Sequence, residues 1–195
     1  MNYSDLVKLQ EKLYFSAEDV AVLLQIKIES AQVLCSRYTK QGIFIRLKKN
    51  FYVLENNWNR YETVDFYQLA NFLQVPSYIS CVSALAFYGI TTQVPREWYE
   101  SISLKRTIQY TAHGTAFYYF KIKSPYYFGF SKAGNTFIAK KEKAFLDACH
   151  LSVFGNYTAD WSAMNTDALD KIVLDEMLKV FPDKTKSFVK SICKT

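Results

Sequence analysis

The stretch from Phe15 to Leu54, FSAEDVAVLLQIKIESAQVLCSRYTKQGIFIRLKKNFYVL, constrains the fold more than any other part of the chain. Its apolar residues first recur at helical spacing in two short segments, which stop at Gly42, a residue type common just after a helix. From Ile43 onward, apolar and polar residues alternate around a break at Lys49-Asn50, which predicts a two-stranded hairpin. Two helices followed by a hairpin is the element order of a winged helix-turn-helix.

Capping signals place the helices in this part of the chain. Ser4 stands in an N-cap position before an apolar repeat, so a first helix is expected over residues 5–14. Ser16 opens a second helix, where Asp19 completes a capping box. After a short turn, a third helix follows, and its apolar face is formed by Ile28, Ala31, Leu34, Cys35 and Tyr38.

The opposite face of the third helix has the chemistry of a recognition helix. Gln32 and Arg37 match the hydrogen-bonding edges of adenine and guanine, and the basic hairpin tip would meet the sugar-phosphate backbone. The predicted DNA-binding residues are Lys27, Gln32, Ser36, Arg37, Lys40, Arg46, Lys48, Lys49 and Asn50. The alternative is that this module only contacts other proteins and that its charges are simply solvated.

The remainder of the chain predicts a second, α+β domain. Polar residues 55–63 lack periodicity and are expected to be a linker between a domain at 1–56 and one at 64–195. Helical patterns cover 64–73, 80–88 and 140–151, and a tail helix is expected over 166–181, with a last one running from Pro182 to Lys194. Between them lie short β-like runs at 99–104, 107–112, 115–123, 126–130 and 135–139, which predict an antiparallel sheet of about four or five strands.

The net charge of +6 is concentrated in two blocks, at 1–54 and 96–143. The second block predicts another basic face, with Lys105, Arg106, Lys121 and Lys123 as candidates to bind RNA or an acidic protein partner. Aromatic residues make up 17% of the chain and crowd the same region. They either stack single-stranded bases or divide between a core and a protein interface.

Several classes of function find no support in the sequence. No apolar run reaches about 18 residues and the N-terminus is polar, so we expect a soluble, cytoplasmic protein without membrane contact. Cys35, Cys81, Cys149 and Cys193 lie too far apart for a metal knuckle, and we expect them reduced and mostly buried. No motif for nucleophilic, phosphate-loop or metal chemistry occurs, so no catalytic residue, metal or cofactor is predicted.

A few isolated residues needed separate consideration as catalytic candidates. His113 is expected in a turn and His150 near a helix end, neither with a catalytic partner pattern. Glu97 and Glu100 are expected in a loop. Because Glu142, Lys143 and Asp147 do not all share one helical face, we expect one of the two acids to pair with a basic group and fix the helix against the sheet.

Three stretches together carry a family resemblance. They are GIFIRLKKNFYVL at the end of the N-terminal module, PSYISCVSALAFYGITTQVP from Pro76 to Pro95, and IAKKEKAFLDACHL. The second has a Pro-x-Tyr-x-Ser start and a Gly before Gln-x-Pro, and the third has an Ala-x-x-Glu-Lys-Ala-x-x-Asp pattern. In these features the chain resembles the AbiEi family of antitoxins, from type IV abortive-infection toxin-antitoxin systems of bacteria.

The resemblance implies a function for each half of the chain. The N-terminal module would be a repressor that binds inverted repeats in its own promoter. The C-terminal domain would counter a cognate nucleotidyltransferase-like toxin, by direct contact or indirectly. Two residues depart from the family pattern: Lys27 stands where a Ser or Thr N-cap is frequent, and Asn50 where a wing glycine is common.

Overall fold

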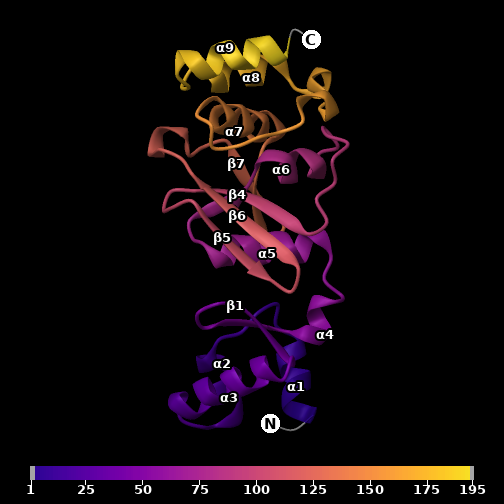
Figure 1. The fold of residues 1–195 in the computed structure, drawn as a ribbon, viewed down its shortest axis with the longest axis vertical. Helices are drawn as coiled ribbons and strands as arrows, with labels where there is room; N and C mark the ends of the chain where they lie inside the picture. Colours follow the sequence, from indigo (N-terminus) through magenta and orange to yellow (C-terminus); the bar gives the residue numbers. More distant parts are fainter. Residues whose placement is uncertain (1–2, 194–195) are drawn as a thin grey trace.

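The computed structural model describes residues 3–193, with side chains from Val7 onward, so the predicted helix end at Lys194 lies outside the described residues. The chain is a mixed α/β structure with helices at its N-terminal end, a six-stranded sheet in the middle and helices at its C-terminal end (Figure 1). The N-terminal part contains α1 (Tyr3–Gln10), α2 (Ala17–Leu24), α3 (Ile28–Lys40), β1 (Phe44–Lys48) and β2 (Phe51–Leu54).

Local signals account for these N-terminal elements. The Ser16–Asp19 capping box is present at the start of α2, as predicted. A turn at residues 25–27 leads into α3, and Gly42 follows α3 with a φ of +74°. The hairpin pairs β1 with β2 around Lys49-Asn50. The first helix differs from the prediction, because it already includes Ser4 and ends at Gln10.

The larger part of the chain begins without a linker. Residues 55–63 were expected to be one, but α4 (Glu55–Trp58) directly follows β2, and Trp58 is buried. The Tyr61 hydroxyl donates to the Leu13 carbonyl at 2.6 Å, so this segment is fastened to the N-terminal part. The prediction of a linker was wrong because this polar segment is anchored by its two aromatic side chains, Trp58 and Tyr61.

The sheet has six strands in the order β5-β6-β4-β3-β8-β7. Its strands are β3 (Ser77–Ile79), β4 (Trp98–Ser103), β5 (Ile108–Ala112), β6 (Thr115–Lys121), β7 (Phe130–Ala133) and β8 (Thr136–Ala139). The expected purely antiparallel sheet is wrong, since β4 pairs with β6 and β3 with β8 in parallel. Alternation along a strand reports which face is buried but carries no information on the direction of its neighbour.

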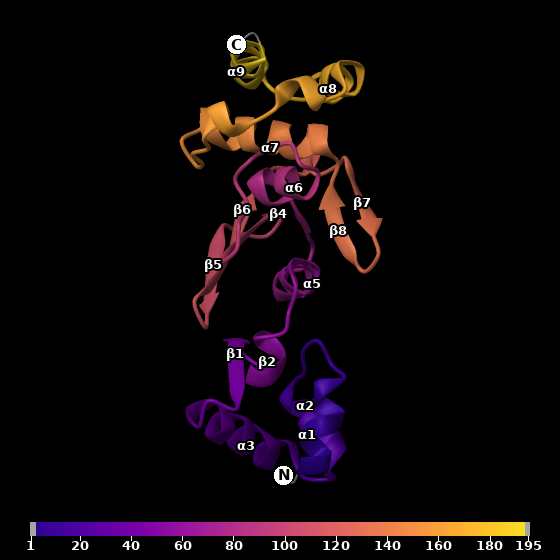
Figure 2. The ribbon, with the colours of Figure 1, turned by 90° about the vertical axis from the view of Figure 1, so that its right-hand side faces the viewer.

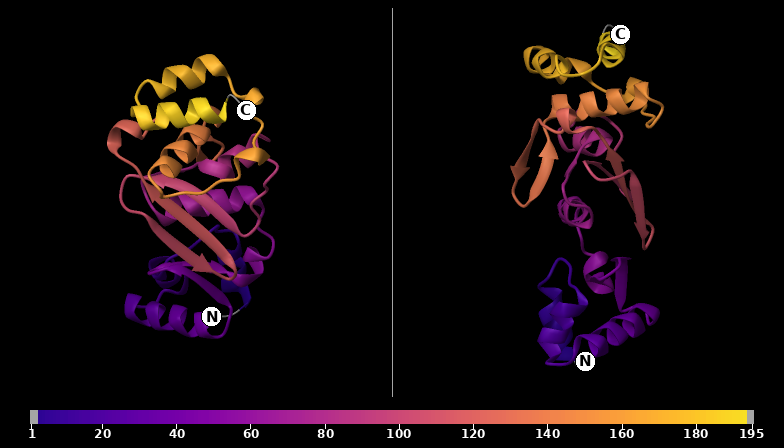
Figure 3. Two further views of the ribbon diagram at one scale, coloured as in Figure 1. Left: turned by 45° about the horizontal axis from the view of Figure 1, so that its top comes forward. Right: turned by 90° about the vertical axis from the view of Figure 1, so that its left-hand side faces the viewer.

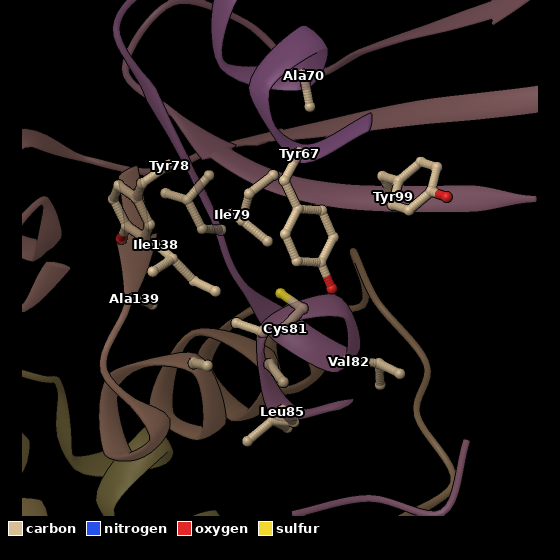
Figure 4. Packing of buried hydrophobic residues seen from close by; sticks show 14 of the residues in the cluster. Tyr67, Ala70, Tyr78, Ile79, Cys81, Val82, Leu85, Tyr99, Ile138 and Ala139 are labelled. Atoms are coloured by element: carbon tan, nitrogen blue, oxygen red, sulfur yellow. The ribbon is translucent and has the colours of Figure 1, made fainter. Parts of the chain in front are cut away.

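Helices cover both faces of this sheet. They are α5 (Thr63–Leu73), α6 (Cys81–Phe87), α7 (Lys141–Val153), α8 (Lys171–Leu178) and α9 (Asp183–Ile192). The arms of the sheet, β5-β6 and β7-β8, curve around α5, while α6 and α7 lie on the other side and α8 and α9 cover α7 (Figures 2 and 3). Figure 4 shows the centre of the core, to which Tyr67, Ile79 and Leu85 all contribute.

Two further expectations differ from the structure. Residues 126–130 were expected to be a strand, but Tyr126 ends the short 3-10 turn η1 (Ser124–Tyr126), and β7 begins only at Phe130. The tail helix expected over 166–181 is divided into η3 (Thr166–Ala168) and α8, after η2 (Trp161–Ala163). Asp170 caps α8 by accepting from Ile172 and Val173, which marks the later start.

Candidate nucleic-acid interface

The predicted recognition face of α3 is presented to solvent. Ala31 and Cys35 anchor the helix in the N-terminal core, and the opposite side is exposed. The side chains of Gln32, Ser36 and Lys40 form no hydrogen bond with any described residue. These three residues follow each other at four-residue intervals, so they lie along one line of the helix surface. Arg37 lies beside this line, with its guanidinium 5.4 Å from the centroid of the Tyr38 ring.

The connection before α3 sets the direction of that face. Gln25 adopts a left-handed conformation with a φ of +53° at the end of α2, and the Ile26 amide donates to the Ala21 carbonyl at 3.1 Å. Lys27 is the N-cap residue of α3 but makes no side-chain cap, so its exposed ammonium group remains available to a ligand. The three-residue turn has the length typical of helix-turn-helix motifs.

The hairpin β1-β2 forms a layer shared by two cores. Phe44, Tyr52 and Leu54 pack with the N-terminal helices. The alternate side chains belong to the core of the larger part, and they are Ile45, Leu47, Phe51 and Val53. Because successive residues of a strand point to opposite faces, the hairpin is buried on both sides. It is therefore structural along most of its length.

Two of the residues predicted at the hairpin tip already have partners within the chain. The Lys48 ammonium donates to the Leu73 carbonyl at 2.7 Å, at the end of α5. The Asn50 side chain accepts from the Ala17 amide at 2.9 Å and donates to the Glu18 carboxylate at 2.6 Å, at the start of α2. Sequence reasoning missed these contacts because both partners are distant along the chain.

Arg46 and Lys49 are the exposed basic residues of the tip, and Asn50 is exposed although its side chain is engaged. The Arg46 Nε donates to the Lys48 carbonyl at 3.3 Å, which leaves most of its guanidinium free. Burial, and secondarily the neighbouring charge of Lys105, lower the pKa of Lys48. The predicted nine-residue set is thus separated into α3 residues, two exposed basic residues of the hairpin and two residues engaged within the protein.

The second predicted basic face gathers at one end of the large sheet. The Lys121 amide donates to the Thr107 hydroxyl at 3.0 Å, and Lys121 is the register partner of Ser103, so the ends of β4 and β6 meet there. Lys105, Arg106, Lys121 and Lys123 are all exposed, and none has an ion-pair partner among residues 3–193. Along β6, Phe117 and Tyr119 belong to the core, whereas Tyr118 and Phe120 are half-buried on the other face.

The charged residues of α7 form a buried network. Lys143 and Asp147 pair one helical turn apart, and both side chains are fully buried. Asp147 also accepts from the Tyr78 hydroxyl at 3.0 Å and the Ser80 hydroxyl at 2.8 Å. Burial raises the pKa of Asp147, and Lys143 opposes that effect. The prediction that an acid of this cluster pairs with a base is confirmed, but the pair lies within α7, and the helix is held against the sheet by the bonds of Lys143 and Asp147 to Tyr78 of β3.

Glu100 is the buried acid that the sequence did not reveal. As an acid next to aromatic residues it was expected in a loop, but it lies in β4, within the β-like run predicted at 99–104, and 6% of its surface is exposed. Its carboxylate accepts from the Val82 amide and from the Tyr157 hydroxyl, each at 2.9 Å. Burial raises the pKa of Glu100 to about 7. Tyr157 is too remote in sequence for any spacing rule to have linked the two residues.

Other features of the described residues bear on the class of protein. Residues 3–193 contain no group of three or more His, Cys, Asp or Glu side chains that could hold a metal ion. None of the helices in this range has the length and apolarity needed to cross a membrane. The four cysteines are free, and three of them are buried. No protein-family model matches the chain, and no curated protein is significantly similar to it.

Proposed function

We propose that this chain is a DNA-binding transcriptional autorepressor and the antitoxin of a bacterial abortive-infection system. The observation that carries the proposal is the outer face of α3, where polar side chains suited to base edges stand exposed and unpartnered. In this proposal α2, the three-residue turn and α3 are a helix-turn-helix, β1-β2 is its wing, and α3 enters the major groove of promoter DNA. A dimer bound to inverted repeats would place one α3 helix in the major groove of each half-site.

The contacts of the hairpin refine which residues meet DNA. Gln32 and Arg37 would read bases, and Ser36 and Lys40 would bind bases or phosphates. Lys27, Arg46 and Lys49 would bind phosphates, which position the protein without reading sequence. Lys48 and Asn50 would act indirectly, because their side chains already hold the hairpin against α5 and α2. The proposed wing therefore contacts DNA through fewer residues than its composition indicates.

A mobility-shift titration with DNA from upstream of the gene tests this interface. We expect Arg37→Ala to weaken binding about tenfold or more and to relax sequence preference, because one bidentate base contact is lost. Lys49→Ala should reduce the slope of log affinity against log salt by about 0.9, the value for one phosphate contact. Lys48→Ala should leave that slope unchanged.

The matched control is Lys132→Ala, which removes an exposed lysine of β7 far from α3. It should bind as the unaltered protein does. Unchanged binding by both Arg37→Ala and Lys49→Ala would refute the DNA interface.

The antitoxin part of the proposal rests on the resemblance, and two of the three resembling stretches meet in the fold. Tyr78 and Ser80 come from the second resembling stretch, and Lys143 and Asp147 come from the third. These four side chains meet in one buried network. A buried ion pair needs every one of its partners. The network is therefore a physical reason for the residue types and spacings of the two stretches.

Coexpression with the product of the neighbouring gene tests the antitoxin activity. We expect the chain to restore growth when that product is toxic, and Arg37→Ala to retain this activity while losing repression. A stable complex on a sizing column would indicate direct neutralisation, and separate elution with restored growth would indicate indirect antagonism. Failure of the unaltered chain to restore growth would refute this part of the proposal.

The second basic face supports a second candidate function. Four basic residues gather at one end of the sheet without an acidic partner in the described part of the chain. In this alternative the chain is a non-enzymatic interaction protein, and that face binds RNA or an acidic protein. Weak DNA binding that does not change with salt, together with tight and salt-sensitive RNA or protein binding, would favour it over the repressor.

A further inference from the structure

A cavity of about 290 Å³ lies where the end of β6, the η1 turn and the C-terminal half of α7 meet. Its size is just below the range typical of small-molecule sites, about 300–1,000 Å³, so it has room for no more than a single small ligand. The polar and aromatic side chains that line it are Lys121, Lys123, Tyr126, His150, Phe154 and Asn156.

Two uncompensated positive charges line this cavity. Lys121 and Lys123 flank Ile122, whose side chain is buried and whose amide donates to the Ser103 carbonyl at 3.1 Å. Ile122 also lines the cavity, so the two lysines stand on either side of it in the cavity wall. No acid lines the cavity, and neither ammonium group pairs with a described residue. Two adjacent lysines of this kind are suited to a phosphate group.

Two aromatic side chains, Tyr126 and Phe154, form part of the remaining wall. The Tyr126 ring stacks on Phe181, with centroids 5.1 Å apart and planes at 11°, and its edge meets His150 at 4.7 Å. Phe154 contacts His150 at 5.1 Å and is 49% exposed. These contacts hold flat surfaces beside the lysines, and aromatic faces of this kind stack on nucleobases whatever the base.

His150 adds a neutral polar group to the wall. Its Nδ1 lies 3.0 Å from the Thr185 hydroxyl of α9, and its other ring nitrogen bonds to none of the residues described. Burial, followed by the nearby charges of Lys143 and Lys123, lowers the pKa of His150 to about 4. At neutral pH the ring is therefore uncharged, and the lysines supply the positive charge.

We propose that this cavity binds one nucleotide, with its phosphate on Lys121 and Lys123 and its base against the aromatic wall. A bare phosphate, or a peptide segment of Asp and Glu alone, would leave the aromatic side chains uncovered. The nucleotide is either free or the 5′-phosphorylated end of a single strand. The proposal is independent of the α3 interface. It rests on the second candidate function in one respect, because Lys121 and Lys123 belong both to the second basic face and to this cavity.

The two histidines of the chain allow a direct measurement by NMR. Adenosine 5′-monophosphate should raise the pKa of His150 toward the ordinary imidazole value of about 6.5, because the phosphate offsets the charge of Lys123. His113 lies in a turn outside the cavity, and its ring signals should not change when the monophosphate is added. Adenosine alone and inorganic phosphate should each bind more weakly than the monophosphate, since each satisfies only half of the site.

Paired variants separate this cavity from general electrostatic attraction. Replacing Lys121 and Lys123 by Gln should weaken binding of the monophosphate at least about tenfold, the loss typical of one charge-assisted hydrogen bond. Replacing Lys105 and Arg106 by Gln removes the same charge from the same end of the sheet but outside the cavity, and should leave the affinity nearly unchanged. Equal losses in the two variants would overturn the proposal and leave the second candidate function standing.

Short oligonucleotides distinguish the two sources of the ligand. Tighter binding of a 5′-phosphorylated strand than of the monophosphate, lost when the strand ends in a 5′-hydroxyl, would support a strand end. Equal binding of monophosphate and strand would support a free nucleotide. Inorganic phosphate binding as tightly as the monophosphate, or no response of His150 to any of these probes, would overturn the proposal. The Arg37→Ala variant should respond as the unaltered protein does.

Discussion

At the scale of single residues, Glu100 makes the stability of the fold dependent on pH. Its pKa is raised to about 7 by burial, against an ordinary value of 4.5. The folded state therefore binds this proton more tightly, so the contribution is fully present below about pH 4.5 and lost as the pH rises through 7. The difference corresponds to about 3 kcal/mol of unfolding free energy.

We expect Glu100→Gln to remove that slope, because an uncharged amide can still accept hydrogen bonds from the Val82 amide and Tyr157. Urea unfolding of both proteins from pH 4 to 8 measures the difference. His150 contributes the opposite slope, since its pKa is lowered to about 4, but it does so in both proteins and cancels. A difference in unfolding free energy that stays constant across this range would contradict the assignment.

At the scale of the elements, Asn50 fastens the hairpin turn to α2. Its φ of +58° favours glycine, but its side chain bonds to the Ala17 amide, one of the donors that a helix N-terminus leaves without an intrahelical partner. We expect Asn50→Gly to destabilise the fold by about 1–2 kcal/mol. The loss of the side-chain hydrogen bonds outweighs the gain from placing glycine at a positive φ. Thermal unfolding measures the change.

Gln25 is the matched control for Asn50. It has a similar φ of +53° and is exposed, but its side chain forms no hydrogen bond with the described residues. Gln25→Gly should therefore be neutral or slightly stabilising. Equal effects of the two substitutions would show that the Asn50 side chain contributes nothing beyond its backbone conformation.

These elements also show what a sequence can and cannot predict. The bounds of α2, α3, α5 and the hairpin follow from caps, periodicity and turn residues, which act within a few positions of each other. The direction of the strands, the anchoring of residues 55–63 and the partners of Lys48 depend on contacts between distant segments. The exposed face of α3 was also predictable, because the helical periodicity of its apolar residues fixes which face is buried. The nucleotide cavity was not, since its wall combines β6 with α7.

At the scale of the whole molecule, the hairpin joins two cores that sequence reasoning treated as separate domains. One set of its side chains packs with α2 and α3, and the other packs with the core around α5. Tyr14 extends this junction, stacking on Phe51 at 4.2 Å and meeting Phe72 at 4.9 Å. Because the hairpin cannot leave one core without disturbing the other, we expect the chain to unfold as one cooperative unit.

Phe51→Ala tests this cooperativity from a distance. The substitution should lower the unfolding free energy by about 3–5 kcal/mol, as is typical of a large buried aromatic residue. Trp161, which packs against Phe145 and Phe188 near α9, reports on the far end of the molecule when Trp58 and Trp98 are replaced by Phe. In that background, urea unfolding followed by Trp161 fluorescence should shift by the same amount as unfolding followed by circular dichroism.

Val33→Ala, at an exposed site of α3, should shift neither signal. A Trp161 transition that stays in place while the circular dichroism signal splits would mean that the two cores unfold independently, and the hairpin would then belong to the N-terminal module alone.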